Sequence, residues 1–182
     1  MDLGVLSALE YPKVIKLLTE RTSSALGREL AESLVPVTRT EDVVDRLSET
    51  REALDILCSV PNIPLGGIRD VRDTLKRAAI GGVLEPHEFL GIGSVLYAAR
   101  RMKSFFEDIA SLGPILSGYA QSIIPVRTLE LAIENTINEQ GNVRDEATPE
   151  LSRLRREIRS IQQRIREKVY SILHSSEYQK YF

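Results

Sequence analysis

The sequence predicts an all-α protein, and three observations lead to this prediction. Apolar residues recur at intervals of three and four through nearly every segment of the 182-residue chain. This is the period of a helix with one apolar face. Prolines and glycines break the chain between several of these segments. No run of residues alternates between apolar and polar strongly enough to predict a sheet.

Four helices are expected in the first half of the chain. They are predicted over residues 6–18, 26–34, 43–58 and 71–79. Pro12 suits the first turn of a helix. Cys58, the only cysteine, is expected to be a small buried apolar residue in the third helix. "SVPNIPLGG" (59–67) ends that helix, and Gly81-Gly82 closes the fourth as a C-terminal cap.

The second half begins with a longer helix over 86–106, and a further helix covers 129–137. Gly113-Pro114 and Pro125 mark two breaks between them. Residues 142–147 are the one place where a short strand or extended stretch is expected. The helices are expected to pack through eight apolar residues, which are Leu30, Val44, Leu47, Leu54, Leu75, Phe89, Leu96 and Phe106.

The final helix has a pattern of its own. Thr148 is a good N-cap, Pro149 fits the first turn, and Glu150 suits the positive end of the helix dipole. Its apolar residues follow alternating spacings of three and four: Leu151, Leu154, Ile158, Ile161, Ile165 and Ile172, with Lys168 replacing one apolar position. Such a narrow seam is typical of a coiled coil and needs a partner helix. "SSEYQKYF" (175–182) is too short to return along it, so we expect a piece cut after the outgoing arm of a coiled-coil hairpin.

Positive charge is concentrated in this helix. Residues 152–168 hold seven basic and two acidic residues, a local charge of +5, so the rest of the chain carries −7 of the total of −2. The seven are Arg153, Arg155, Arg156, Arg159, Arg164, Arg166 and Lys168. They can be a solvated coiled-coil face paired with Glu157 and Glu167. They can equally contact the phosphates of DNA or ribosomal RNA, because guanidinium forks suit phosphate oxygens.

Three stretches carry a family resemblance. "SSALGRELAESLVP" with "VDRLSETREALDIL" resembles the opening of the core, or lever, domain of MutS-family ATPases. "GGIRDVRDTLKRAAIGGVLEPHEFLGI" is similar to a later part of that domain, and "INEQGNVRDEATPELSRLRREI" to the place where the lever runs into the clamp helices. The residues of "PLGGIRD" and "TPELSRLRREIR" most resemble those of the bacterial MutS-two branch. The resemblance covers essentially the whole chain.

The resemblance implies a lever domain over 1–140 and, over 141–182, a connector with the outgoing clamp helix. It also implies a longer, homodimeric parent protein with a P-loop ATPase that uses ATP and Mg and an Smr-type endonuclease domain. Branched DNA or ribosomal RNA would be the partner, in suppressing homologous recombination or splitting collided ribosomes. The alternative is a purely structural coiled-coil spacer that touches no nucleic acid. The unpaired seam makes self-association a further expectation.

Catalysis is not expected in this chain. The sequence lacks a G-x-x-x-x-G-K-[ST] phosphate loop, and Gly66-Gly67 and Gly81-Gly82 are better interpreted as turns and caps. One cysteine permits no internal disulfide and no cysteine zinc cluster, and His87 and His174 are too isolated to predict a metal site. We therefore expect no cofactor in the chain. No apolar run approaches the length of a membrane span, so we expect no membrane partner and a cytoplasmic protein.

Overall fold

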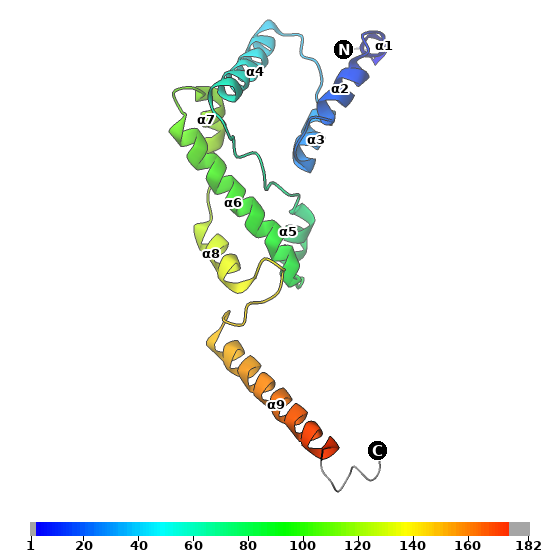
Figure 1. Ribbon diagram of the computed structural model, residues 1–182. Coiled ribbons are helices and arrows are strands. Elements are labelled where there is room, and N and C mark those ends of the chain that lie inside the picture. The colour runs from blue at the N-terminus through cyan, green and yellow to red at the C-terminus, as the bar shows by residue number, and fades with distance from the viewer. Residues whose placement is uncertain (1–2, 175–182) are drawn as a thin grey trace.

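The computed structural model describes residues 3–174 and is built from helices, as predicted (Figure 1). In chain order they are α1 (Leu3–Ala8), α2 (Tyr11–Thr19), α3 (Ala25–Glu32), α4 (Thr40–Ser59), α5 (Arg72–Ala79), α6 (Pro86–Asp108), α7 (Pro114–Gln121), α8 (Arg127–Thr136) and α9 (Pro149–Leu173). Within the described residues there is no strand, only a single antiparallel bridge between Ile137 and Val143. This bridge lies at the predicted extended stretch. The all-α class is confirmed.

Helix α6 is the centre around which the middle of the chain packs. Helices α7 and α8 lie against it, while α4 packs on α7. Helices α1, α2 and α3 form a separate succession in which each packs on the next. Helix α9 extends away from all of these (Figure 1).

The main apolar core lies between α6, α8 and the segment that follows α8. Ile92 of α6, Ile133 of α8 and Ile137 are its buried members. Six half-buried residues pack around them: Val71, Leu84, Phe89, Leu90, Leu96 and Val143. The core therefore joins α8 and the segment that follows it to the central helix α6.

A second, smaller contact joins α4 to α7 through a buried carboxylate. Glu52 lies in α4 and is 8% exposed. Its two oxygens accept hydrogen bonds from the backbone N–H groups of Ile115 (3.0 Å) and Leu116 (2.6 Å), in the first turn of α7. A side chain at Gly113 would place its Cβ only 2.5 Å from the Ile56 Cδ1 atom. A residue with a side chain at this position would force the buried Ile56 side chain to shift.

The predicted packing residues divide into two groups. Phe89 and Leu96 pack against the main core, and Phe106 is half-buried with an edge-to-face contact to Phe105. The other five, Leu30, Val44, Leu47, Leu54 and Leu75, are exposed, so their predicted burial was wrong. Helical periodicity finds the apolar face of a helix but not whether another helix covers it. Cys58, expected to be buried, is also exposed on α4.

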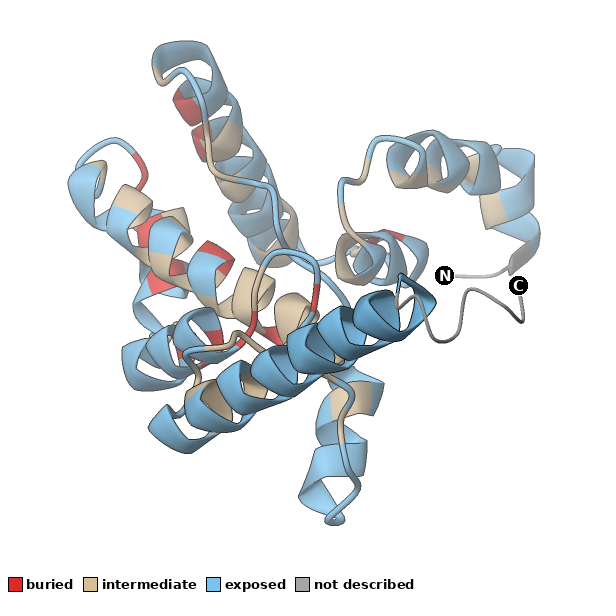
Figure 2. Ribbon diagram, turned by 60° about the horizontal axis from the view of Figure 1, so that its bottom comes forward, coloured by how far each residue is buried: buried red, intermediate tan, exposed pale blue. Residues whose placement is uncertain are grey.

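Exposed apolar surface is a general property of this chain. The accessible surface is 13947 Å², against about 8,800 Å² expected for a compact monomer of 20.4 kDa. Figure 2 shows buried residues only in small groups, with most of α4 and all of α9 exposed or half-buried. Many large apolar residues are among those exposed, including Leu30, Leu47 and Leu54.

Candidate nucleic-acid-binding arm

Local sequence explains where α9 begins. The Thr148 hydroxyl accepts a hydrogen bond from the Leu151 N–H (3.1 Å), Pro149 occupies the first turn, and Glu150 adds negative charge at the positive end of the helix dipole. The helix then runs for 25 residues, a length of about 37 Å. Its predicted cap and first turn are confirmed.

The apolar seam of α9 is open to solvent. Leu154, Ile158, Ile161, Ile165 and Ile172 are each between 42% and 57% exposed. Leu151, next to the connector, is half-buried. No other described helix packs along α9, so the predicted projecting helix is confirmed. The predicted tail "SSEYQKYF" lies outside the described residues.

The seven basic residues of α9 lie on three faces around the seam. At about 100° per residue, one flank of the seam carries Arg155, Arg159 and Arg166. The opposite flank carries Arg153, Arg164 and Lys168. Arg156 lies on the face opposite the seam, where its Nε donates to the Ser152 carbonyl (3.2 Å). The helix therefore presents positive charge on both sides of its apolar surface.

Near the base of α9, the arginines already have partners. The Arg155 Nη1 atom donates to an Asp145 carboxylate oxygen and to the Val143 carbonyl (3.0 Å), while the Arg159 Nη1 atom lies 2.6 Å from the other Asp145 oxygen. These two guanidiniums hold the pKa of the Asp145 carboxyl below its usual range. Arg153 makes longer contacts, 3.4 to 3.5 Å, within its own helix to glutamates one turn away on either side.

The outer half of α9 is different. Among residues 3–174, Arg164, Arg166 and Lys168 make no ion pair, and Glu167 accepts a hydrogen bond from the Gln163 side chain (2.9 Å). Arg164 and Lys168 line the same shallow groove as Ile161 and Ile165, so their alkyl stems cover part of the seam while the charges stay in water. The ion pairs of the α9 arginines therefore lie at its base, residues 149–159, whereas the basic residues of its outer half, residues 160–173, have no acidic partner among the described residues.

The connector between α8 and α9 is anchored by backbone and side-chain hydrogen bonds. The side-chain oxygen of Asn138 accepts from the N–H groups of Gln140 and Asn142. Gly141 has a φ of +77°, which residues with a side chain rarely adopt. A Cβ atom added at Gly141 would lie 3.0 Å from the His87 Cβ atom on α6. Arg144 donates through Nε to the Ile137 carbonyl (3.2 Å). The loop that carries Asp145 is therefore fixed against the start of α6.

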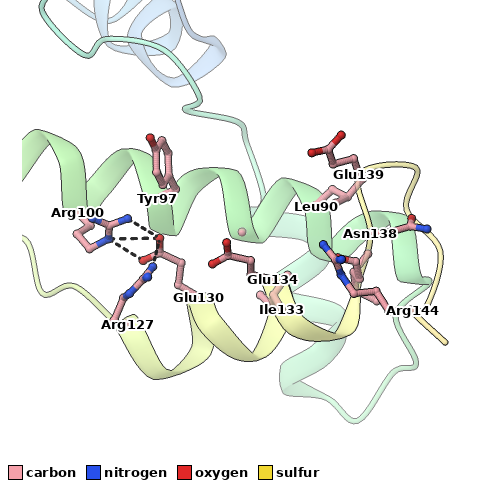
Figure 3. Close-up of a pocket in the computed structure, with 12 residues that line it drawn as sticks. Leu90, Tyr97, Arg100, Arg127, Glu130, Ile133, Glu134, Asn138, Glu139 and Arg144 are labelled. Atoms are coloured by element: carbon pink, nitrogen blue, oxygen red, sulfur yellow. Dashed lines mark hydrogen bonds and ion pairs between the residues drawn. The ribbon is translucent and has the colours of Figure 1, made fainter. Parts of the chain in front are cut away.

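A cleft of about 340 Å³ lies between α6, α8 and this connector (Figure 3). At one end the Arg100 guanidinium makes a two-pronged contact with Glu130, with Nε and Nη2 each 2.9 Å from a carboxylate oxygen. The Arg127 Nη1 atom lies 2.7 Å from the same carboxylate, and Glu130 is only 6% exposed. The hydrogen bond from Arg100 and the nearby positive charges lower the pKa of Glu130.

We call the ion pairs of Glu130 with Arg100 and Arg127 the lock, because they join α6 to α8 across this cleft. Its three arginines are balanced by three glutamates, Glu130, Glu134 and Glu139. Within residues 3–174, no group of three histidine, cysteine or acidic side chains is placed to hold a metal ion. Across the same residues, no helix is long and apolar enough to cross a membrane.

Sequence reasoning found the arginines of α9 but missed the acids that organise them. Asp145 stands in "NVRDEATP", where an acid before an N-cap carries no special signal. Glu130 and Glu52 look like ordinary exposed helical glutamates, because the helical period does not mark them as facing inward. The excess of arginine over acid was the only hint that some guanidiniums needed a partner from elsewhere in the chain.

The chain is similar to bacterial proteins named Endonuclease MutS2. It is 41% identical over 178 residues to that of Bacillus mycoides (strain KBAB4), 38% over 182 residues to that of Brevibacillus brevis, and 40% over 183 residues to that of Geobacillus sp. (strain WCH70). These matches cover 96 to 99% of this chain. The resemblance to the MutS2 branch is confirmed. No family model matches the chain.

The chain spans 23% of the length of these MutS2 relatives. The predicted boundary between residues 140 and 141 falls inside the connector that precedes α9, and it stays a prediction. The role of the seven basic residues also stays a prediction.

Proposed function

We propose that this chain is the lever and outgoing clamp-arm segment of a MutS2-like protein, and that α9 contacts the phosphates of nucleic acid. The segment itself carries no catalysis in this proposal. The longer protein would supply an ATPase that uses ATP and Mg, an Smr-type endonuclease domain and a homodimer interface. It would act on branched DNA in suppressing recombination, or on ribosomal RNA in splitting collided ribosomes.

The outer half of α9 carries the proposal. Arg164, Arg166 and Lys168 have no acidic partner among the described residues, and they lie on both flanks of one exposed helix. Charges held in this way contact backbone phosphates without reading base sequence. The exposed seam beside them would pair with a returning clamp helix, which would present the arginines on the outside of a two-helix arm.

Salt dependence is the direct test. Removing one phosphate contact should make the plot of log affinity against log salt concentration less steep by about 0.9 for duplex DNA. We expect Arg164/Arg166/Lys168→Gln to flatten this plot for binding of branched DNA by the chain. The matched control, Arg21/Arg28/Arg69→Gln, removes three other exposed charges that make no ion pair among the described residues. Equal slopes for the two triple variants would refute phosphate contact by α9.

The spacer alternative is favoured by a specific observation of its own. The lock between Arg100 and Glu130 and the contacts of Asp145 with α9 tie α6, α8, the connector and the base of α9 together. Such a unit can transmit motion along its length whether or not it touches nucleic acid. In that case, neither triple variant would change the binding of DNA or ribosomes. Loss of the contacts of Arg100 with Glu130 and of Asp145 with α9 would still impair the longer protein.

A further inference from the structure

Two arginines on one flank of α9 hold a single carboxylate between them. Arg155 and Arg159 are one helical turn apart, and each guanidinium contacts a different oxygen of Asp145. The site contains two positive charges and one negative charge. A carboxylate in this position occupies the place that an anion with paired oxygens would take, because guanidinium forks bind carboxylate and phosphate in the same geometry.

The carboxylate is supplied by a fixed loop, not by α9 itself. Asp145 follows the Ile137–Val143 bridge and precedes the Thr148 cap by three residues. Arg144, its neighbour, is tied to the Ile137 carbonyl by its side chain and to the Thr136 carbonyl by its backbone N–H (2.8 Å). The contact of Asp145 with α9 therefore links the direction of that helix to the helices around α6.

Arg155 and Arg159 differ in their exposure and in the number of their partners. Arg155 is 36% exposed and also donates to the Val143 carbonyl, so it keeps a partner if Asp145 leaves. Arg159 is 57% exposed, and among the described residues Asp145 is its only partner. Ion pairs this exposed are weak and easily screened. A phosphate group arriving from solvent would compete first for Arg159.

We propose that Asp145 acts as a latch, because its carboxylate occupies an anion-binding site formed by Arg155 and Arg159. A phosphate group displaces this carboxylate from Arg159, and α9 can then change its direction relative to α6. This inference rests on the proposed function for its natural ligand, a nucleic-acid phosphate. The latch regulates when the base of the arm joins the outer half in binding. While it is closed, the basic residues of α9 without an acidic partner among the described residues are Arg156 and the three of the outer half, Arg164, Arg166 and Lys168.

The test uses inorganic polyphosphate, a polyanion that needs no nucleic-acid recognition, and two measurements. The first is the affinity for polyphosphate by titration calorimetry. We expect Asp145→Asn to bind more tightly than the unaltered chain, because the competing carboxylate is removed. Glu150→Gln is the matched control, since Glu150 is an exposed acid at the same end of α9 and its ion pair among the described residues is with Arg153. It should raise the affinity less, through general charge alone.

The second measurement is the distance between spin labels on α6 and α9. Labels at Glu107→Cys and Gln162→Cys in a Cys58→Ser background report the direction of the arm, because both sites are exposed. We expect a narrow distance distribution for the otherwise unaltered chain and for Glu150→Gln. Asp145→Asn should broaden it, and polyphosphate should broaden it in the chain that keeps Asp145.

Two outcomes would overturn the latch. One is an affinity for polyphosphate that rises equally in Asp145→Asn and Glu150→Gln. The other is a distance distribution that neither polyphosphate nor Asp145→Asn changes. Failure of the proposed function looks different: branched DNA would bind with the same salt dependence after removal of the Arg164, Arg166 and Lys168 charges, while polyphosphate still opens the latch.

Discussion

Neutralising Glu52 should destabilise the chain more than its position in a helix suggests. The change is Glu52→Gln, which keeps the size of the side chain and removes its charge. Both carboxylate oxygens now accept backbone N–H groups at the start of α7. A glutamine offers one accepting oxygen, so its amide group would face the other N–H donor and leave that donor unsatisfied.

The magnitude follows from these two hydrogen bonds. A hydrogen bond to a charged group contributes about 1.5–3 kcal/mol, and a negative charge at a helix N-terminus adds about 0.3–1 kcal/mol. Because Glu52 is 8% exposed, water cannot easily take the place of its carboxylate. Since a glutamine retains one of the two hydrogen bonds, we expect a loss of about 2 kcal/mol in the free energy of unfolding. For a chain of this size that lowers the thermal midpoint by about 4–8 °C.

Thermal unfolding followed by circular dichroism measures this destabilisation. Asp55→Asn is the matched control, because Asp55 lies in the same helix, is exposed and makes no ion pair among the described residues. It should shift the midpoint by less than about 2 °C, because surface substitutions change the free energy of unfolding by less than about 0.5 kcal/mol. If both variants unfolded at the temperature of the unaltered chain, the contact between α4 and α7 would not contribute to stability, and the reasoning would be refuted.

Two further predictions concern the core and the lock. Leu96→Ala should lower the free energy of unfolding in urea by about 2–5 kcal/mol, because Leu96 packs on the main core. Leu47→Ala, at a residue 63% exposed, should lower it by less than about 0.5 kcal/mol. Equal losses for the two variants would contradict the division between covered and exposed helix faces. Glu130 has a pKa below its ordinary 4.5 owing to Arg100, so its stabilising effect is complete above that value and disappears as pH falls through the lowered pKa. Glu130→Gln should therefore be less stable than the unaltered chain near neutral pH, with the difference shrinking in acid, in urea titrations at several pH values. The control Glu134→Gln, at an exposed site, should change the free energy of unfolding by less than about 0.5 kcal/mol near neutral pH.

The sequence was sufficient for the parts of the fold that depend on local chemistry. Thr148 caps α9 as expected because an N-cap needs only its own side chain and the next turn. Pro12 lies in the first turn of α2 for the same reason. Helix α7 was not predicted, since its eight residues, "PILSGYAQ", lack a helical stripe. Glu52 of α4 caps it from a distant part of the chain, and periodicity within a short segment cannot reveal such a contact.

The candidate site shows the same division between local and distant causes. The position of every arginine on α9 follows from its helical spacing, so the flanks around the seam could be predicted. Their different states could not, because Asp145 reaches Arg155 and Arg159 only through the turn that Gly141 allows. Leu47 and Leu54 were expected in a core for a related reason. An apolar helix face looks the same in sequence whether its partner is present or absent.

The two halves of α9 should respond to different conditions, because different forces act on them. Its base is held by exposed ion pairs of Asp145 with Arg155 and Arg159, which salt screens and phosphate can replace. Its seam is apolar, and the association of apolar surfaces is not weakened by moderate salt. A partner helix on the seam would therefore persist under conditions that loosen the base. In the function that we propose, the direction of the arm and its pairing with a second helix would thus change independently, so that a clamp could open and close while its two helices stay together.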